Sequence, residues 1–219
     1  MKYSKIACYG LFARKPKKPF NPPTVNGVQC FYMKGTNGSG KSTIPEMMRQ
    51  LDPEAYYVVV MGSKLLTVFP SFNTIAIGKY DSSNNKGADY LRDTEHIMDA
   101  VSVSELPEFA GMHLILDGII PACILETWVE RLRGRERELV VAFLSTPLET
   151  CLERIRGRNR NKKITDHTND MVTRKYNRIA SFRERHTDLF PEIKGCIIDG
   201  LTTKELMLVN FLNRNMESL

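Results

Sequence analysis

A glycine-rich stretch, GTNGSGKST at residues 35–43, constrains the fold of this chain more than any other feature. It matches the pattern G-x-x-x-x-G-K-[ST], with Lys41 and Ser42 in the last two positions. The apolar run Val28–Lys34 leads directly into it, and a helix is expected from about Lys41 to Leu51. Glycines let the backbone wrap tightly so that successive N–H groups point at a bound phosphate, and the helix adds its positive amino end. The pattern in this context predicts a phosphate-binding loop (P-loop) between a buried parallel strand and a helix.

The side chains of this loop have separate expected tasks. Lys41 should reach the β- and γ-phosphates of a nucleotide, and the Ser42 hydroxyl should ligate magnesium. The guanine-reading motif N-K-x-D is missing from the sequence, which argues against a GTPase. ATP with Mg²⁺ is therefore the expected cofactor pair. The loop residues expected to bind it are Gly35, Asn37, Gly38, Ser39, Gly40, Lys41, Ser42 and Thr43.

The rest of the chain alternates between strand-like and helix-like segments. The clearest helix start is Thr146-Pro147-Leu148-Glu149, which combines an N-cap threonine, a proline at the first helical position and a glutamate at the third. A second capping box, Thr202-x-x-Glu205, should open the C-terminal helix. This alternation predicts an α/β fold, with one domain over residues 28–219 and a mainly parallel sheet flanked by helices. Further strands are expected at Tyr56–Met61, Asn73–Ile77, His113–Leu116 and Leu139–Leu144, and further helices at Asp89–Val101 and Pro121–Arg133.

Basic residues gather in two parts of the chain. Residues 1–27 carry six lysines and arginines and no acid, and their prolines exclude a regular helix, so they are expected to form an extended N-terminal arm after a short strand at Lys5–Phe12. Residues 154–185 carry eleven basic side chains against three acids. Binding to a polyanion, either a nucleotide or a nucleic acid, fits this distribution, although a net charge of +6 also occurs without functional meaning.

Several classes of protein are excluded by what the sequence lacks. No window approaches the roughly 20 apolar residues that a membrane span requires, and the N-terminus does not resemble a signal peptide. Five scattered cysteines show neither zinc-ligand spacing nor a disulfide framework and are interpreted as small buried residues. A soluble cytoplasmic protein without a membrane partner is expected.

Phosphoryl transfer from ATP also needs a carboxylate to orient the acceptor hydroxyl or to hold magnesium. Asp117 follows the apolar run His113–Leu116, and ligands of open α/β sheets lie beyond the carboxyl ends of the strands. Asp81 follows another strand candidate in the same way, and Asp89 begins the next expected helix. Asp81 and Asp117 are the stronger candidates, with Asp117 also a magnesium ligand, while a turn at Asp117 and an N-cap role for Asp89 are the simpler alternatives.

Cations that neutralise the transferred phosphoryl group are available after the strand at Leu139–Leu144. Arg154 and Arg158 are four residues apart and share one face of the expected helix. Gly157 is expected to end this helix, which would place Arg158 and Arg160 in an arginine-rich lid over the phosphates. A solvated basic helix end is the alternative.

Taken together, these pieces resemble the P-loop nucleoside and nucleotide kinases. The resemblance rests on GTNGSGKST, LILDG and STPLETCLERIRGRNR and spans about residues 28–160. The segment IAIGKYDSSNNKGADYL is further similar to bacteriophage P-loop kinases that phosphorylate 5-hydroxymethyluracil within DNA during thymidine hypermodification. This resemblance implies that Lys41 and Ser42 bind ATP–magnesium, that Asp81 or Asp117 lies near the acceptor, and that Arg158 or Arg160 belongs to the lid.

Three functions are therefore compatible with the sequence. The first is a kinase acting on a hydroxyl carried by DNA, with ATP and DNA as partners. The second is a kinase of free nucleosides, nucleoside monophosphates or polynucleotide 5′ ends, which would use the same catalytic parts. The third is a P-loop ATPase that regulates nucleic-acid binding, which the acids at Asp81 and Asp117 disfavour.

Overall fold

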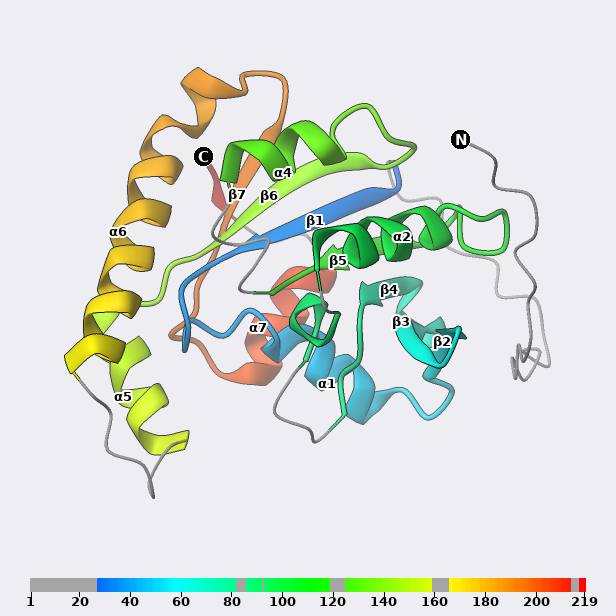
Figure 1. Ribbon diagram of the computed structural model, residues 1–219, viewed down its shortest axis with the longest axis horizontal. Helices are drawn as coiled ribbons and strands as arrows, with labels where there is room; N and C mark the ends of the chain where they lie inside the picture. The colour runs from blue at the N-terminus through cyan, green and yellow to red at the C-terminus, as the bar shows by residue number, and fades with distance from the viewer. Residues whose placement is uncertain (1–26, 82–85, 92, 119–124, 159–165, 214–216) are drawn as a thin grey trace.

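Eight strands form one sheet in the computed structural model, which describes residues 27–81, 86–91, 93–118, 125–158, 166–213 and 217–219 (Figure 1). Their order across the sheet is β2-β3-β4-β5-β1-β6-β7-β8. The strands are β1 (Gln29–Lys34), β2 (Tyr56–Val60), β3 (Ser63–Phe69), β4 (Thr74–Ile77), β5 (His113–Leu116), β6 (Glu138–Leu144), β7 (Lys194–Ile198) and β8 (Glu217–Ser218).

The five central strands, β4, β5, β1, β6 and β7, pair in parallel, so the prediction of a mainly parallel sheet is confirmed. Cys30 of β1 pairs with Leu114 of β5 on one side and with Leu139 of β6 on the other. Antiparallel pairs close both edges, β2 with β3 and β3 with β4 on one side and β7 with β8 on the other. The β2–β3 pair shifts its register between Val58 and Val59.

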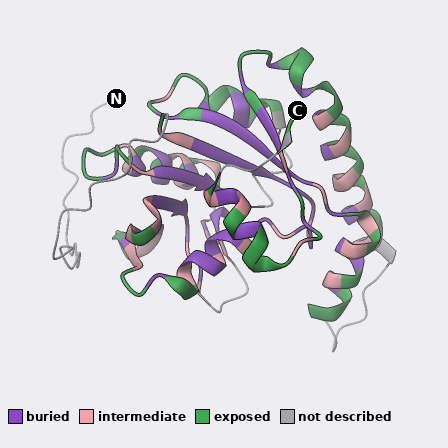
Figure 2. Ribbon diagram, turned by 180° about the vertical axis from the view of Figure 1, so that it is seen from behind, coloured by how far each residue is buried: buried purple, intermediate pink, exposed green. Residues whose placement is uncertain are grey.

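Helices cover both faces of the sheet (Figure 1). Alternate residues of β1 point to opposite faces: Tyr32 belongs to a core with α2, α4 and α6, whereas Phe31 and Met33 belong to a second core with α1 and α7. All three are fully buried, which explains why the strand reads as a continuous apolar run (Figure 2). The helices are α1 (Thr43–Leu51), α2 (Thr94–Ser104), α4 (Leu125–Leu132), α5 (Leu148–Arg158), α6 (Asp166–Leu189) and α7 (Lys204–Leu212), with short 3₁₀ helices η1 (Pro70–Phe72) and η2 (Ala88–Tyr90).

Three helix boundaries differ from the sequence-based expectation. The helix expected from Asp89 begins at Thr94, because the Asp93 side chain accepts a hydrogen bond from the His96 amide and caps it, so the N-cap role considered for Asp89 is wrong. Thr203, and not Thr202, caps α7, because the Thr203 side chain accepts from the Leu206 amide. Gly157 does not end α5, which continues through Arg158, since one glycine in a helix costs only about 1 kcal/mol.

Arg137, the residue before β6, binds the end of α2 and the loop that follows it. Its side chain is buried and donates to the carbonyl oxygens of Ser104 at 2.6 Å, Phe109 at 2.9 Å and Met112 at 2.8 Å. These bonds satisfy carbonyls at and beyond the end of the helix, where no intrahelical partner exists. Arg137 therefore has a structural task.

Other expectations from the sequence fall partly outside the described residues. Cys30, Cys151 and Cys196 are buried, as expected. Among the helices that the structure describes, none is long and apolar enough to cross a membrane. Residues 1–26 with the predicted arm, its strand at Lys5–Phe12 and Cys8, and also Pro121, Cys123 and Arg160, lie outside the described residues.

Candidate active site

The glycine-rich loop connects β1 to α1 and packs closely against α5. Gly38 and Gly40 have φ angles of +80° and +101°, a region that side chains rarely adopt. A Cβ atom at Gly38 would collide with the Cys151 carbonyl oxygen of α5. The positive φ angles and the close approach to α5 therefore require glycine in this loop. A loop that wraps around a phosphate has the same requirement.

Two side chains from the α5 region bind the carbonyl groups of this loop. The Thr146 hydroxyl donates to the Ser39 carbonyl at 2.7 Å. The Arg154 guanidinium donates to the Gly38 carbonyl at 3.3 Å and to the Gly200 carbonyl, after β7, at 2.8 Å. Because the C=O and N–H groups of a trans peptide point in opposite directions, holding these carbonyls toward α5 directs the following amides away from it.

Lys41 bridges the two ends of the same loop. Its ammonium group donates to the Gly35 carbonyl at 2.8 Å and to the Thr36 carbonyl at 3.0 Å, and the side chain is buried. The predicted phosphate-binding lysine is therefore positioned inside the loop.

Asp117, at the carboxyl end of β5, joins the P-loop directly. Its carboxylate accepts a 2.6 Å hydrogen bond from the Ser42 hydroxyl through Oδ2, and a second from the Tyr80 hydroxyl through Oδ1. Burial raises the pKa of the Asp117 carboxyl, while the hydrogen bonds from Ser42 and Tyr80 and the charge of Lys41 act in the opposite direction. Burial, followed by the charge of Asp117, raises the pKa of Tyr80, which keeps its hydroxyl protonated as a donor.

A glycine-containing loop after β4 encloses the same carboxylate. Lys79 and Gly87 form an antiparallel bridge, and the Ala88 amide donates to the Asp117 carbonyl at 2.9 Å. Gly87 has a φ angle of +61°, and a Cβ atom there would collide with Asp117 Oδ1. The space between this loop and the carboxylate therefore has no room for a side chain at position 87.

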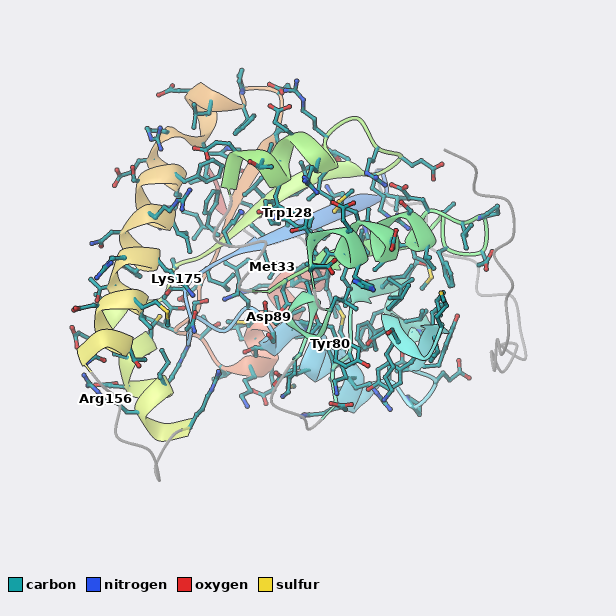
Figure 3. All side chains as sticks on the ribbon, in the orientation of Figure 1. Met33, Tyr80, Asp89, Trp128, Arg156 and Lys175 are labelled. Atoms are coloured by element: carbon teal, nitrogen blue, oxygen red, sulfur yellow. The ribbon has the colours of Figure 1, made fainter. Side chains whose placement is uncertain are left out.

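The other two candidate acids differ in their surroundings. Asp89 lies close to Asp117: its charge contributes to raising the pKa of Asp117, and a Cβ atom at Gly118 would be 3.1 Å from Asp89 Oδ1. The half-buried Asp81 forms ion pairs with Lys64 at 3.6 Å and Lys79 at 3.7 Å. Figure 3 shows Asp89 and Tyr80 in the central part of the molecule.

Some of the basic residues of α5 and α6 lie apart from this centre. Figure 3 shows Arg156 and Lys175 on the side formed by these two helices, away from Asp89. Arg158, expected in a lid loop, is the exposed last residue of α5. Arg154 is the basic residue of α5 that binds the P-loop, through the Gly38 carbonyl.

Two residues of the site were not identified from the sequence. Tyr80 follows a strand and could equally have been a core tyrosine, although Gly78-Lys79-Tyr80 is part of the segment similar to the phage kinases. Thr146 was interpreted only as a helix cap, and its contact with Ser39 depends on how α5 packs. Neither contact has a signal in local sequence.

Comparison with known proteins agrees with this arrangement. The sequence profile described as 5-hmdU DNA kinase matches residues 12–208, which is most of the chain. The chain belongs to the 5-hmdU DNA kinase family. This kinase is 41% identical over 217 residues to 5-hmdU DNA kinase 1 of Salmonella phage ViI, covering 96% of this chain and 97% of that protein. It is 34% identical over 106 residues to the 5-hmdU DNA kinase of Bacillus phage SP10, covering 48% of this chain and 16% of that larger protein.

Solved structures show a weaker likeness. Deoxyadenosine kinase from M. mycoides, with dCMP and dCDP bound, aligns with a TM-score of 0.41 and 13% identity over 85% of this chain and 98% of that one. The same enzyme with bound dATP gives a TM-score of 0.39 and 15% identity. The family relationship therefore rests on the sequence, and it makes this kinase a phosphotransferase.

Proposed function

We propose that this kinase transfers the γ-phosphate of ATP to the 5-hydroxymethyl group of hydroxymethyluracil in DNA. The observation that carries the proposal is that Asp117, at the end of β5, accepts a hydrogen bond from Ser42 and lies within the field of Lys41 at the P-loop after β1, in a chain of this family. The relatives from two phages are named 5-hmdU DNA kinases, so the place of action would be the host-cell cytoplasm.

Ser42 and Asp117 fit a magnesium ion chemically. Both offer oxygen atoms, the hard ligands that Mg²⁺ prefers, and the Ser42 hydroxyl donates its proton to the carboxylate, so its lone pairs are available to a cation. The described residues contain no cluster of three histidine, cysteine or acidic side chains, so the remaining ligands would be phosphate oxygens and water. Bound Mg²⁺ would neutralise charge that develops on the phosphates.

The P-loop supplies the nucleotide side of the reaction. Lys41 would exchange the carbonyls of Gly35 and Thr36 for β- and γ-phosphate oxygens, while the loop amides and the amino end of α1 bind the remaining charge. The cradle itself would consist of Gly35, Asn37, Gly38, Ser39, Gly40, Ser42 and Thr43, with Arg154 holding its shape.

An acid close to the acceptor would take the hydroxyl proton as phosphoryl transfer proceeds. Because Asp117 is engaged with Ser42, Asp89 is the first candidate, and its closeness to Asp117 supports this role. Asp81 is the second candidate, although its pairs with Lys64 and Lys79 occupy the carboxylate. Arg158 and Arg160 would close over the transferring phosphoryl group as a lid.

An exposed stripe of arginines on α6 suits the phosphate backbone of DNA. Arg174, Arg178 and Arg185 are exposed, and their spacing of four and seven residues places them on one side of the helix. Such contacts bind DNA without reading its sequence. The target base would leave the duplex, at roughly a few kcal/mol, to reach the centre near Asp89.

Labelled ATP tests the proposal. The kinase is incubated with γ-labelled ATP and, separately, hydroxymethyluracil-containing DNA, ordinary DNA, oligonucleotides with free 5′ hydroxyls, or free nucleosides and nucleotides. Label is expected in the hydroxymethyluracil DNA alone. Label confined to small molecules or to 5′ ends would support the second function considered above, and phosphate release without transfer would support an ATPase.

Variants locate the activity in the P-loop. Lys41→Ala is expected to abolish transfer, whereas Lys194→Ala, which removes an exposed lysine at the start of β7, should keep it. Transfer activity surviving in Lys41→Ala would exclude the assigned nucleotide site.

A further inference from the structure

Tyr80 is a buried side chain that contacts the reaction centre without belonging to the P-loop. It is 2% exposed, its ring packs against Phe69 with centroids 6.5 Å apart, and its hydroxyl donates to Asp117 Oδ1. Neither the nucleotide nor the acceptor needs this hydroxyl in the function proposed above. Its contact with Asp117 therefore calls for a separate explanation.

The backbone before Tyr80 is fixed by the antiparallel part of the sheet. The Gly78 amide donates to the Leu65 carbonyl at 2.6 Å, and the Gly78 carbonyl accepts from the Thr67 hydroxyl at 2.7 Å. A Cβ atom at Gly78 would collide with the Gly87 carbonyl, so the chain segments that begin and end the loop after β4 are in close contact. Tyr80 thus projects from a rigid base toward Asp117.

The two oxygens of Asp117 have different partners as a result. Oδ1 accepts from Tyr80, and Oδ2 accepts from Ser42. A carboxylate rotates readily about its last side-chain torsion, because that torsion has only broad preferences. With Oδ1 held by Tyr80, rotation would break a buried hydrogen bond, so Oδ2 stays directed at the P-loop.

We propose that Tyr80 is a positioning residue that fixes the orientation of the Asp117 carboxylate toward Ser42 and the metal ion bound there. This inference rests on the function proposed above, because it assumes that Asp117 and Ser42 hold Mg²⁺ with ATP. In this role Tyr80 acts through Asp117 and would touch neither substrate nor metal. Its loss should therefore affect the geometry of transfer more than the binding of substrates.

Tyr80→Phe tests this role, with Tyr57→Phe as the matched control. Phenylalanine keeps the ring against Phe69 and removes only the hydroxyl. Tyr57 of β2 also has a buried hydroxyl, which has no hydrogen-bond partner within the described structure, so its removal should leave activity unchanged. Tyr80→Phe should lower kcat by about 10- to 100-fold, the range expected for a misplaced catalytic group. The KM for DNA should change by less than about threefold, whereas the KM for ATP should rise several-fold, because ATP binds together with the metal ion that Asp117 would hold.

Nucleotide binding gives a second readout that does not depend on turnover. Calorimetry with a non-hydrolysable ATP analogue should show unchanged affinity without Mg²⁺ and several-fold weaker affinity with it in Tyr80→Phe. An unchanged kcat and an unchanged effect of Mg²⁺ in a folded Tyr80→Phe would overturn the inference. Failure of the wild-type kinase to phosphorylate hydroxymethyluracil DNA would count instead against the proposed function, and Mg²⁺-dependent analogue binding would still test Tyr80.

Discussion

The Ser42 hydroxyl donates a 2.6 Å hydrogen bond to Asp117 Oδ2, and this bond joins the start of α1 to the end of β5. The two residues are 75 positions apart in the sequence, and parallel pairing of β1 with β5 brings them together. The donor loop and the acidic strand end therefore form one unit before any substrate arrives.

Replacement of Asp117 by asparagine should raise the stability of the protein and lower its activity. Burial raises the pKa of Asp117 above its ordinary value of 3.8, so the folded protein holds a proton at pH values where the unfolded chain has lost it. Stability therefore falls as the pH rises from about 3.8 through the folded pKa, and the ionised carboxylate is destabilising above it. Asp117→Asn should raise the melting temperature at pH 7–8, measured without nucleotide or metal, and lower kcat on the order of 10²- to 10³-fold.

The exposed Asp188 of α6 provides the control for this prediction. Asp188→Asn should leave both the melting temperature and kcat close to those of the wild type. A lower melting temperature in Asp117→Asn at pH 7–8 would show that the ionised carboxylate does not destabilise the folded protein.

Alanine at Gly87 should damage the site through steric collision. The new methyl group would displace the Asp117 carboxylate, and the backbone angles of φ +61° and ψ −149° add strain of about 1–3 kcal/mol. We expect kcat to fall about 100-fold. Gly134→Ala is the matched control, because Gly134 has a similar φ angle of +73° but open space around it. That variant also places a side chain at a positive φ angle but should keep its activity, so equal kcat losses in the two variants would exclude the collision as the cause.

The arginine stripe of α6 should appear in the salt dependence of DNA binding. Each phosphate contact contributes about 0.9 to the slope of log affinity against log salt concentration. Arg174→Ala combined with Arg178→Ala should therefore reduce the slope by about 2 in fluorescence anisotropy titrations. A control pair of other exposed basic residues, Arg133→Ala with Lys194→Ala, should keep the wild-type slope. The same slope in all three proteins would place the DNA contact elsewhere.

His186 should make stability fall in weak acid. Its side chain is buried beside the rings of Phe143, Phe182 and Phe190, and this burial lowers its pKa below 6.5. The unfolded chain therefore binds a proton at pH values where the folded protein does not, so stability is lost as the pH falls below about 6.5. His186→Phe should flatten the decline in the free energy of unfolding between pH 7 and 5, measured by urea titration. His96→Phe changes an exposed histidine of α2 and should leave the decline as it is in the wild type.

Arg137 should be among the most sensitive positions for stability. Arg137→Met would leave the carbonyls of Ser104, Phe109 and Met112 without their partner, and each unsatisfied buried group costs about 1–3 kcal/mol. A loss of at least about 3 kcal/mol in the free energy of unfolding is expected. Arg133→Met, which removes the exposed pairs of Arg133 with Glu130 and Glu192, should cost less than about 1 kcal/mol. A loss of that small size in Arg137→Met would mean that other groups replace the guanidinium.

The sequence predicted the parts of this site that follow from motif and strand order. Lys41 and Ser42 belong to a recognisable loop, and the rule that parallel strands end at one edge predicted the approach of Asp117. The strand β3 was not predicted, because the turn before it is Met61-Gly62 and Met61 adopts a positive φ angle without the usual asparagine signal.

Contacts that depend on tertiary packing had no such signal. The closeness of Asp89 to Asp117 results from the bridge between Lys79 and Gly87, which turns the chain back toward β5. The contact of Tyr80 with Asp117 depends on the same turn. Sequence periodicity describes which face of an element is apolar, but it does not describe how two loops meet.

The antiparallel strands at the edges of the sheet bear on the behaviour of this kinase in concentrated solution. A parallel sheet left open would offer rows of unpaired amides and carbonyls to neighbouring molecules. Here one edge ends in β8, which is only two residues long, and the other ends in β2, whose register shift at Val58 and Val59 interrupts regular pairing. Both edges are therefore poor templates for strand addition, which protects the enzyme from edge-to-edge aggregation.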